Sequence, residues 1–199
     1  GQSLRSKSEA ELRPLRRNMQ VVFQDPYGSF DPRHKVERLV GEPLHLLEKQ
    51  PTGKERREMI ATALHEVGRS SSDMDKYPHV FSGHQRQRFS IARAIITRPK
   101  LIVADEPVSA LDVSIRAQIL DLFADLNQKL GVAYIFITHD LTVARAITDD
   151  VMVMHEGRIV EHGRTGDILD HPQSEAAQAL VAAAPDLHRA IVRRLEMQG

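Results

Sequence analysis

The sequence predicts an α/β fold in which helices cover a mostly parallel sheet and a helical subdomain spans about residues 33–98. Two observations carry this prediction. Short apolar runs alternate with segments of helical periodicity, which is the pattern of strands joined by crossover helices. Between about 25 and 97, helical segments follow one another without a strand, which indicates a helical subdomain on the sheet.

The clearest predicted strand is Leu101–Asp105, where four apolar residues precede two carboxylates and Pro107. Pro107 has no N–H to donate to a neighbouring strand, so the strand should end at the acids. A continuous apolar run of this length is typical of a strand buried on both faces, and 132–138 is likewise expected to be buried. The expected strands are 18–23, 101–105, 132–138, 151–155 and an antiparallel edge strand within 155–163.

The clearest predicted helix runs over 112–130, where apolar residues recur every three or four positions. Lys129 suits the negative end of its dipole and Gly131 ends it. Residues 70–78 are expected to form a loop. Other helices are expected around 9–12, over 36–49, 54–67, 83–97 and 141–148, and from 165 onward with breaks at Pro172 and Pro185.

The composition argues against several classes of function. The 199 residues contain 27 Lys and Arg against 27 Asp and Glu, so no net field favours nucleic acid or a membrane surface. Without cysteine there are neither disulfides nor thiolate metal sites. No apolar run approaches the length of a membrane span. A role at a membrane would therefore require a partner that holds the chain there.

Two expected strands end in residues capable of acid–base or phosphate chemistry. Asp105 and Glu106 follow one apolar run, and His139 follows the next. In open α/β sheets, ligands bind outside the carboxyl ends of the strands. One acid can organise a metal while the other polarises a nucleophile. The alternative is that the acids only cap a strand or start a turn, but two such endings together favour a site.

A second candidate site lies at the start of the helix expected over 83–97. Ser82 and Gln85 have the spacing of a capping box. Capping does not explain Gly83, which costs helix stability where a better helix former would serve. A small residue at a helix N-terminus lets an anion approach the backbone N–H groups. The capping box is therefore compatible with a phosphate site.

In order and rough spacing, five elements resemble the nucleotide-binding domain of an ABC transporter. The wording FQDPYGSFDPR and YPHVFSGHQRQR is similar to the ATPase subunits of oligopeptide, dipeptide and nickel importers. The resemblance implies a P-loop NTPase fold, with a partial nucleotide-binding domain over 1–187 and a peptide-importer type of helical extension over 165–199. The five elements are Gln24 after a strand, Ser82-Gly83-x-Gln85, Leu101 to Glu106, Ser109-Ala110-Leu111-Asp112 and Thr138-His139-Asp140.

The resemblance implies ATP and Mg²⁺ as cofactors and gives four residues roles in hydrolysis. Glu106 resembles the general base that polarises the attacking water. His139 resembles the switch histidine that contacts the γ-phosphate. Gln24 resembles the glutamine that senses Mg²⁺ and the water, and Asp105 resembles the acid that holds Mg²⁺.

Four further residues are implied to contact nucleotide or the dimer interface. Ser82, Gly83 and Gln85 resemble the signature that closes on ATP held by the opposite subunit. Asp112 resembles the acid of the loop at the dimer interface. Position 84 departs from the family, because His84 stands where glycine is usual; it could crowd closure or add a donor.

The resemblance implies an ATP-hydrolysing importer subunit, peripheral on the cytoplasmic face of the cell (inner) membrane, that couples hydrolysis to peptide or nickel uptake. Its implied partners are a second ABC ATPase subunit, membrane permease subunits and, indirectly, a substrate-binding protein, with no nucleic acid. One alternative is a non-catalytic interaction or regulatory fragment that docks a membrane subunit. Another is an ABC ATPase of DNA repair or translation, but such proteins need long coiled-coil insertions or a basic linker, which this neutral sequence lacks.

The sequence also departs from the family in its phosphate loop. G-x-x-x-x-G-K-[S/T] does not occur in the 199 residues, and the nearest string, Pro51-Thr52-Gly53-Lys54-Glu55, is expected to start a helix. In the family this loop precedes the segment of Gln24. The N-terminal portion of the domain is therefore expected upstream of Gly1, and the chain as written is expected to bind ATP weakly or not at all.

Overall fold

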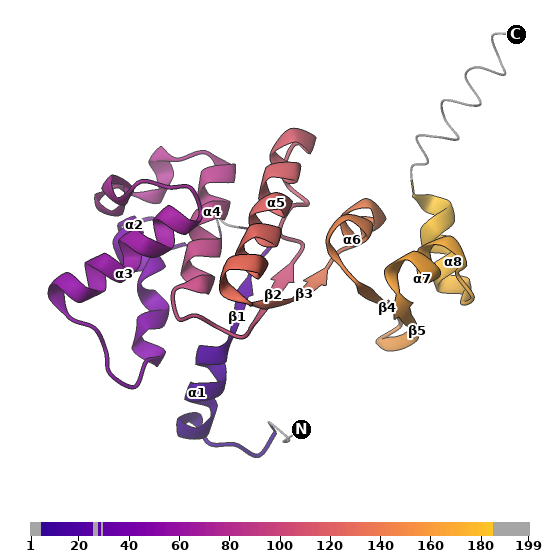
Figure 1. Ribbon diagram of the computed structural model, residues 1–199, viewed down its shortest axis with the longest axis horizontal. Helices are drawn as coiled ribbons and strands as arrows, with labels where there is room; N and C mark the ends of the chain where they lie inside the picture. Colours follow the sequence, from indigo (N-terminus) through magenta and orange to yellow (C-terminus); the bar gives the residue numbers. More distant parts are fainter. Residues whose placement is uncertain (1–4, 26–27, 29, 185–199) are drawn as a thin grey trace, which may run out of the picture. The chain divides into compact units, whose positions relative to one another are not determined.

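The computed structural model describes residues 5–184 except 26, 27 and 29. The chain divides into two compact units, Gly1–Ile137 and Thr138–Gly199, which are described separately below (Figure 1). The predicted helical break at Pro185 and the end of the predicted extension over 165–199 lie outside the described residues.

A three-stranded parallel sheet forms the centre of the first unit. It consists of β1 (Met19–Val22), β2 (Leu101–Asp105) and β3 (Ala133–Ile137), with β2 in the middle. These strands confirm the predicted ones over 18–23, 101–105 and 132–138. All three run in the same direction. Their carboxyl ends therefore lie along one edge of the sheet.

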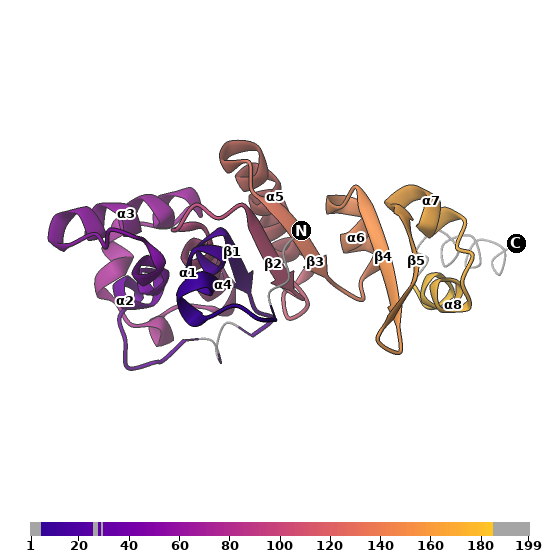
Figure 2. The ribbon, with the colours of Figure 1, turned by 90° about the horizontal axis from the view of Figure 1, so that it is seen from below.

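One face of this sheet is covered by helices. The side chains of Ile102 and Ala104 on this face are fully buried. Phe123 of α5 (Val113–Leu130) packs edge-on against Tyr134 and Phe136, with ring centroids 5.2 and 5.1 Å apart. Figure 2 shows α5 along this side of the strands. The helix ends at Gly131, whose φ of 65° is a left-handed conformation that glycine adopts without steric cost.

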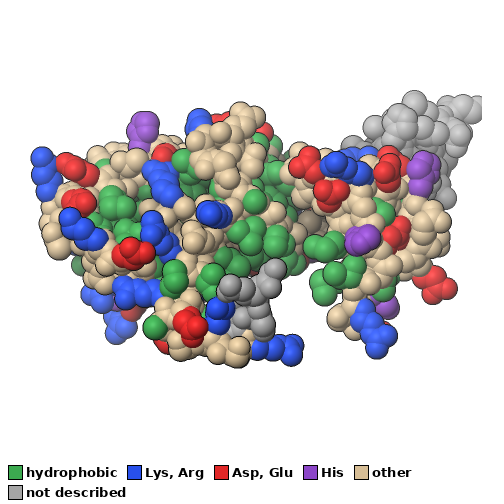
Figure 3. All heavy atoms as spheres, turned by 60° about the horizontal axis from the view of Figure 1, so that its bottom comes forward, with side chains coloured by type: hydrophobic (Ala, Val, Ile, Leu, Met, Phe, Trp, Pro, Cys, Tyr) green, Lys and Arg blue, Asp and Glu red, His purple; other side chains and the backbone are tan. Residues whose placement is uncertain are grey.

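The other face corrects the prediction that β2 and β3 are buried on both sides. Met19, Ile135 and Ile137 are 41%, 42% and 49% exposed, and Leu101 and Val103 are only partly buried. Figure 3 shows hydrophobic side chains gathered on this part of the molecule. Burial on both faces requires an element on each. The described helices α4 (Gly83–Ile95) and α5 lie on the opposite face, which leaves this apolar face in contact with solvent.

A broken helix stands where the sequence predicted a continuous one over 36–49. The α-helix ends at Val40, and a 3₁₀-helix follows after Gly41. Pro43 causes the break, because it has no N–H and its ring clashes with the preceding turn. The helices over 54–67 and 83–97 are confirmed. The elements are α2 (Val36–Val40), η1 (Glu42–Leu46), α3 (Gly53–Glu66), η2 (Ser71–Asp75), η3 (Pro78–Val80) and α4 (Gly83–Ile95).

Residues 70–78, predicted as a loop, contain a 3₁₀-helix organised by a buried carboxylate. Asp73 is 3% exposed and accepts hydrogen bonds from Arg69 at 2.6 Å and Lys76 at 2.9 Å. Burial acts to raise the pKa of Asp73, but the hydrogen bonds from Lys76 and Arg69 outweigh it and lower the pKa. Charge pairing at Asp73 and burial of the Met74 side chain, which is 5% exposed, together hold this turn, and neither has a periodic signal in the sequence.

The remaining helix of the first unit is α1 (Glu9–Asn18), which extends the predicted helical segment around 9–12. A capping box starts it, with the Ser8 N–H donating to the Glu11 carboxylate at 2.8 Å. Across residues 5–184, the described helices include none with the length and apolar character to cross a membrane.

The second unit is built around an antiparallel hairpin, as predicted. β4 (Asp150–His155) pairs with β5 (Arg158–Arg164) through a turn at Glu156 and Gly157, both with positive φ. The predicted helices over 141–148 and from 165, with a break at Pro172, are confirmed. They are α6 (Leu141–Ile147), α7 (Thr165–Asp170) and α8 (Glu175–Ala183), and a small core joins Val153, Ile168 and Ala177.

The Asp73 cluster leads to a stability prediction. We expect Asp73→Asn to lower the free energy of unfolding by about 2 kcal/mol at pH 7, because two charge-assisted hydrogen bonds are weakened in a buried site. The folded-state pKa is lowered, so this stabilisation is present above the unfolded-state pKa of about 4 and is lost as the pH falls through the folded-state pKa. Urea denaturation at pH 7 and pH 3 measures both effects.

Asp75→Asn is the matched control. The Asp75 side chain is 60% exposed and lies 3.4 Å from Arg57, so its loss should cost less than about 1 kcal/mol. Equal losses for the two variants would show that the buried cluster is not what stabilises this turn.

Candidate functional site

The carboxyl edge of the sheet carries a strained glutamate. Glu106 directly follows β2 and has a φ of 45°, a left-handed conformation that is uncommon for residues other than glycine. Such a conformation costs on the order of 1–3 kcal/mol and persists only where the surroundings enforce it. The Glu106 N–H donates to the Ile137 carbonyl at 2.9 Å. The Glu106 carbonyl accepts from the N–H and the hydroxyl of Ser109 at 3.3 and 3.1 Å. The peptide groups on both sides of Glu106 are therefore fixed.

Gln24 is brought to the same loop. It lies two residues beyond β1, and its amide nitrogen donates to the Ser109 hydroxyl at 3.3 Å. Ser109 therefore connects Gln24 to the Glu106 backbone. In the sequence, Ser109 stands out only as part of the string that ends at Asp112. The signal available in the sequence was a hydroxyl three residues after the acid, a spacing that suits a turn.

Asp105 ends β2 and is partly buried at this edge. Together with Glu106 and Gln24 it forms what we call the carboxylate edge. Among the described residues, no group of three or more His, Cys, Asp or Glu side chains is placed to hold a metal ion. A single carboxylate with an amide oxygen nevertheless suits Mg²⁺, which keeps several waters and takes its other ligands from substrate phosphates. Asp105 and Gln24 fit that donor set.

The start of α4 forms a second corner, which we call the signature corner (Ser82–Gln85). The Ser82 N–H donates to the Gln85 side-chain oxygen at 3.1 Å, and the two residues form the predicted capping box. Ser82 is exposed, and its hydroxyl lies 3.0 Å from Nδ1 of His84. The first-turn N–H groups of this helix and its positive dipole end are of the kind that bind phosphate.

Buried aromatic side chains pack next to the signature corner. Phe81 and Phe89 are buried and meet edge-on with their ring centroids 4.8 Å apart. The Arg69 guanidinium lies 5.5 Å from the centre of the Phe81 ring and 5.6 Å from that of Phe89. Because Arg69 also binds Asp73, the buried carboxylate helps to fix the segment that leads into Ser82.

Two predicted residues lie outside both groups. Asp112 is exposed at the N-terminal end of α5, where its carbonyl accepts from the Arg116 N–H at 2.8 Å. His139 is exposed and belongs to the second unit, so its approach to Glu106 stays a prediction. The segment after His139 is fixed by Asp140, whose carboxylate accepts from the Thr142 N–H at 2.9 Å and caps α6.

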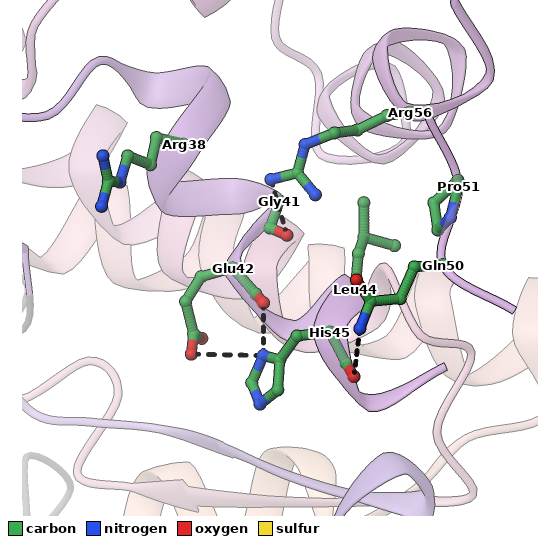
Figure 4. A pocket seen from close by; sticks show the side chains of 8 residues that line it. All are labelled: Arg38, Gly41, Glu42, Leu44, His45, Gln50, Pro51 and Arg56. Atoms are coloured by element: carbon green, nitrogen blue, oxygen red, sulfur yellow. Dashed lines mark hydrogen bonds and ion pairs between the residues drawn. The ribbon is translucent and has the colours of Figure 1, made fainter. Parts of the chain in front are cut away.

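A pocket of about 220 Å³ lies among α2, η1 and the start of α3 (Figure 4). The Arg56 guanidinium donates to the Gly41 carbonyl at 3.0 Å on one side of it. None of the predicted site residues lines it. The nearby string 51–55 is confirmed as a helix start, since α3 begins at Gly53. The lining residues are Arg38, Gly41, Glu42, Leu44, His45, Gln50, Pro51 and Arg56.

A protein-family model described as ABC transporter matches residues 1–109, more than half of the 199 residues. The chain belongs to the ABC transporter family. The match covers the carboxylate edge and the signature corner of this ABC chain, which confirms the resemblance drawn from its motifs.

Proteins of peptide transport are similar to this ABC chain. The dipeptide transport ATP-binding protein DppF of Haemophilus influenzae is 46% identical over 195 residues, which are 97% of this chain and 59% of that protein. The oligopeptide transport ATP-binding protein OppF of Streptococcus pyogenes serotype M1 is 43% identical over 179 residues, which are 90% of this chain and 58% of that protein. The chain therefore spans less than two thirds of the length of these relatives.

Similarity to solved structures confirms the predicted fold of the P-loop NTPases of the ABC class. A structure described as the dimeric, post-hydrolysis state of the ATP-binding cassette MJ0796 bound to ADP and Pi aligns with a TM-score of 0.69 and 28% sequence identity. The alignment covers 80% of this chain and 68% of that one. In that solved relative the cassette fold therefore holds a nucleoside diphosphate, ADP, together with phosphate.

The signature corner leads to a prediction about local stability. We expect Ser82→Ala to lower the free energy of unfolding by about 1 kcal/mol, because the substitution removes the N-cap hydroxyl of α4. Ser114→Ala is the matched control, since Ser114 is exposed inside α5, where alanine is the better helix former. Urea denaturation of both variants checks this, and an unchanged stability in Ser82→Ala would contradict the capping role.

Proposed function

We propose that this chain is part of an ATP-hydrolysing subunit that drives the import of peptides across the cytoplasmic membrane. The observation that carries the proposal is the strained backbone of Glu106, which is held at the carboxyl edge of the sheet and linked through Ser109 to Gln24. Strained, over-determined residues cluster at active sites. The peptide class is supported by the names of the two relatives, which are dipeptide and oligopeptide transport proteins.

In this proposal the carboxylate edge performs the hydrolysis. Glu106 accepts a proton from the attacking water, and Gln24 orients that water. His139 donates a hydrogen bond to the γ-phosphate. Asp105 and Gln24 would hold Mg²⁺, which neutralises charge on the phosphate oxygens when bound. A positioned general base contributes about 10²–10⁴-fold to the rate, or roughly 3–5 kcal/mol of the barrier.

The signature corner acts in this proposal on ATP held by a second subunit. Ser82, Gly83 and Gln85 present N–H and hydroxyl donors at the positive end of α4, and Asp112 lies at the interface between the subunits. The dimeric state described for MJ0796 supports this arrangement. Permease subunits would hold the pair at the cytoplasmic face of the membrane, and a substrate-binding protein would deliver peptide to them.

The role of Glu106 leads to a prediction for a subunit extended upstream of Gly1 to include the phosphate loop. Glu106→Gln should retain ATP binding and lower turnover by about 10²–10⁴-fold, because the amide cannot accept the proton. His139→Ala should also lower turnover strongly. Phosphate release at saturating ATP measures both, with the exposed Asp125→Asn as a matched control. Near wild-type turnover in Glu106→Gln would reject it as the base.

We further propose that the 199-residue chain by itself binds ATP weakly or not at all. The phosphate-loop motif does not occur in it, and the sheet face with Met19, Ile135 and Ile137 is exposed. In a longer subunit, an upstream segment would cover this face and supply the backbone N–H groups that cradle the phosphates.

Calorimetric titration with Mg²⁺ and ATP tests this second proposal on the 199-residue chain and on the upstream-extended subunit. The extended form should bind at least about 100-fold more tightly, a difference of about 2.7 kcal/mol. Equal affinities would show that the described residues form the nucleotide site without the upstream segment.

A further inference from the structure

Gln87 is a buried polar residue that links α4 to the turn after Glu106. Its side chain is 1% exposed, and its amide nitrogen donates to the Pro107 carbonyl at 2.9 Å. It lies on the buried side of α4 with Ser90 and Ile91, where helical periodicity favours apolar residues. None of the roles assigned above uses this side chain.

Burying the polar amide of Gln87 costs more free energy than burying an apolar side chain would. Its side-chain oxygen is buried without a hydrogen-bond partner among the described residues. Burying an unpaired acceptor is unfavourable, and an unbranched apolar side chain of similar length would avoid that cost. The hydrogen bond to Pro107 is therefore the interaction for which an amide is needed at this position.

That hydrogen bond completes a continuous connection between the two groups of site residues. Pro107 follows Glu106, and Ser109 joins the Glu106 carbonyl to Gln24. Gln87 lies in the same helix as the signature corner. Gln87 thus adds a third restraint to the Glu106–Pro107 segment, on the carbonyl that follows the strained residue.

We propose that Gln87 is a positioning residue, which fixes the direction of the Glu106 carboxylate by holding the Pro107 carbonyl against α4. The effect of Gln87 on turnover rests on the proposed function, whereas its effect on the structure of the turn does not. Removing the bond frees one side of a left-handed residue that needs restraint from its surroundings. Misplacement of a catalytic group lowers the rate of the chemical step more than it weakens binding of substrate.

Gln87→Met is the test variant, because it keeps the length of the side chain and removes the amide. In the upstream-extended subunit, kcat for ATP should fall about tenfold while KM stays within about twofold. In the Glu106→Gln background, the same substitution should change the residual rate by less than about twofold, because no base remains to be positioned. Equal losses in both backgrounds would overturn the proposal.

Ser90→Ala is the matched control on the same helix. Ser90 is also 1% exposed, and its hydroxyl has no hydrogen-bond partner among the described residues. It should leave kcat within about twofold of wild type. If Ser90→Ala lowers kcat as much as Gln87→Met does, packing of α4 and not the bond to Pro107 is responsible, and the proposal fails.

Hydrogen exchange on the 199-residue chain provides a readout that does not depend on ATP hydrolysis. The Glu106 N–H donates to the Ile137 carbonyl at the end of β3, and the Ser109 N–H donates to the Glu106 carbonyl within the turn. Gln87→Met should speed their exchange about tenfold while leaving amides in α5 unchanged. Unchanged exchange at Glu106 and Ser109 would overturn the proposal even if the subunit hydrolyses ATP. Absence of hydrolysis in the wild-type subunit would instead reject the proposed function.

Discussion

The restraint of one backbone residue, Glu106, organises the candidate site. Its left-handed φ is incompatible with continuation of β2, so the chain turns away from the sheet where the carboxylates begin. The Ile137 carbonyl accepts a hydrogen bond from the Glu106 N–H. The Glu106 carbonyl accepts two more, from the N–H and the hydroxyl of Ser109. A short carboxylic side chain placed on a mobile turn would sample many directions. Here the surrounding peptide groups limit that freedom before any ligand arrives.

The parallel sheet explains why residues distant in sequence meet at this turn. β1 and β2 are adjacent and run in the same direction, so Gln24 and Asp105 leave the sheet on one edge. Helix α4 packs beneath the same strands and brings Gln87 within 2.9 Å of the Pro107 carbonyl. Hydrogen bonds from side chains to backbone carbonyls therefore connect segments that the sheet has already brought close.

Much of this arrangement could be predicted from the sequence, because strands and helices have local signals. The apolar run before Asp105 and the capping pattern at Ser82 each placed a candidate residue at the end of an element. The break at Pro43 was visible in the sequence and was missed, because the apolar periodicity over 36–49 continues across it.

The partners of Ser109 and Gln87 could not be predicted, because a hydrogen bond between distant segments depends on tertiary distances. Burial of β3 was predicted wrongly, because an apolar run shows what a strand can bury and not what covers it.

The exposed sheet face has a consequence for handling the polypeptide. β3 is an edge strand of the described sheet, and its own residues Ile135 and Ile137 are about half exposed. An edge strand has unpaired N–H and C=O groups, to which a strand of another chain can bind, and exposed apolar side chains strengthen such pairing. Concentrated preparations of the 199-residue polypeptide will consequently tend to self-associate and scatter light, and dilute solutions or a solubilising fusion partner suit physical measurements on it.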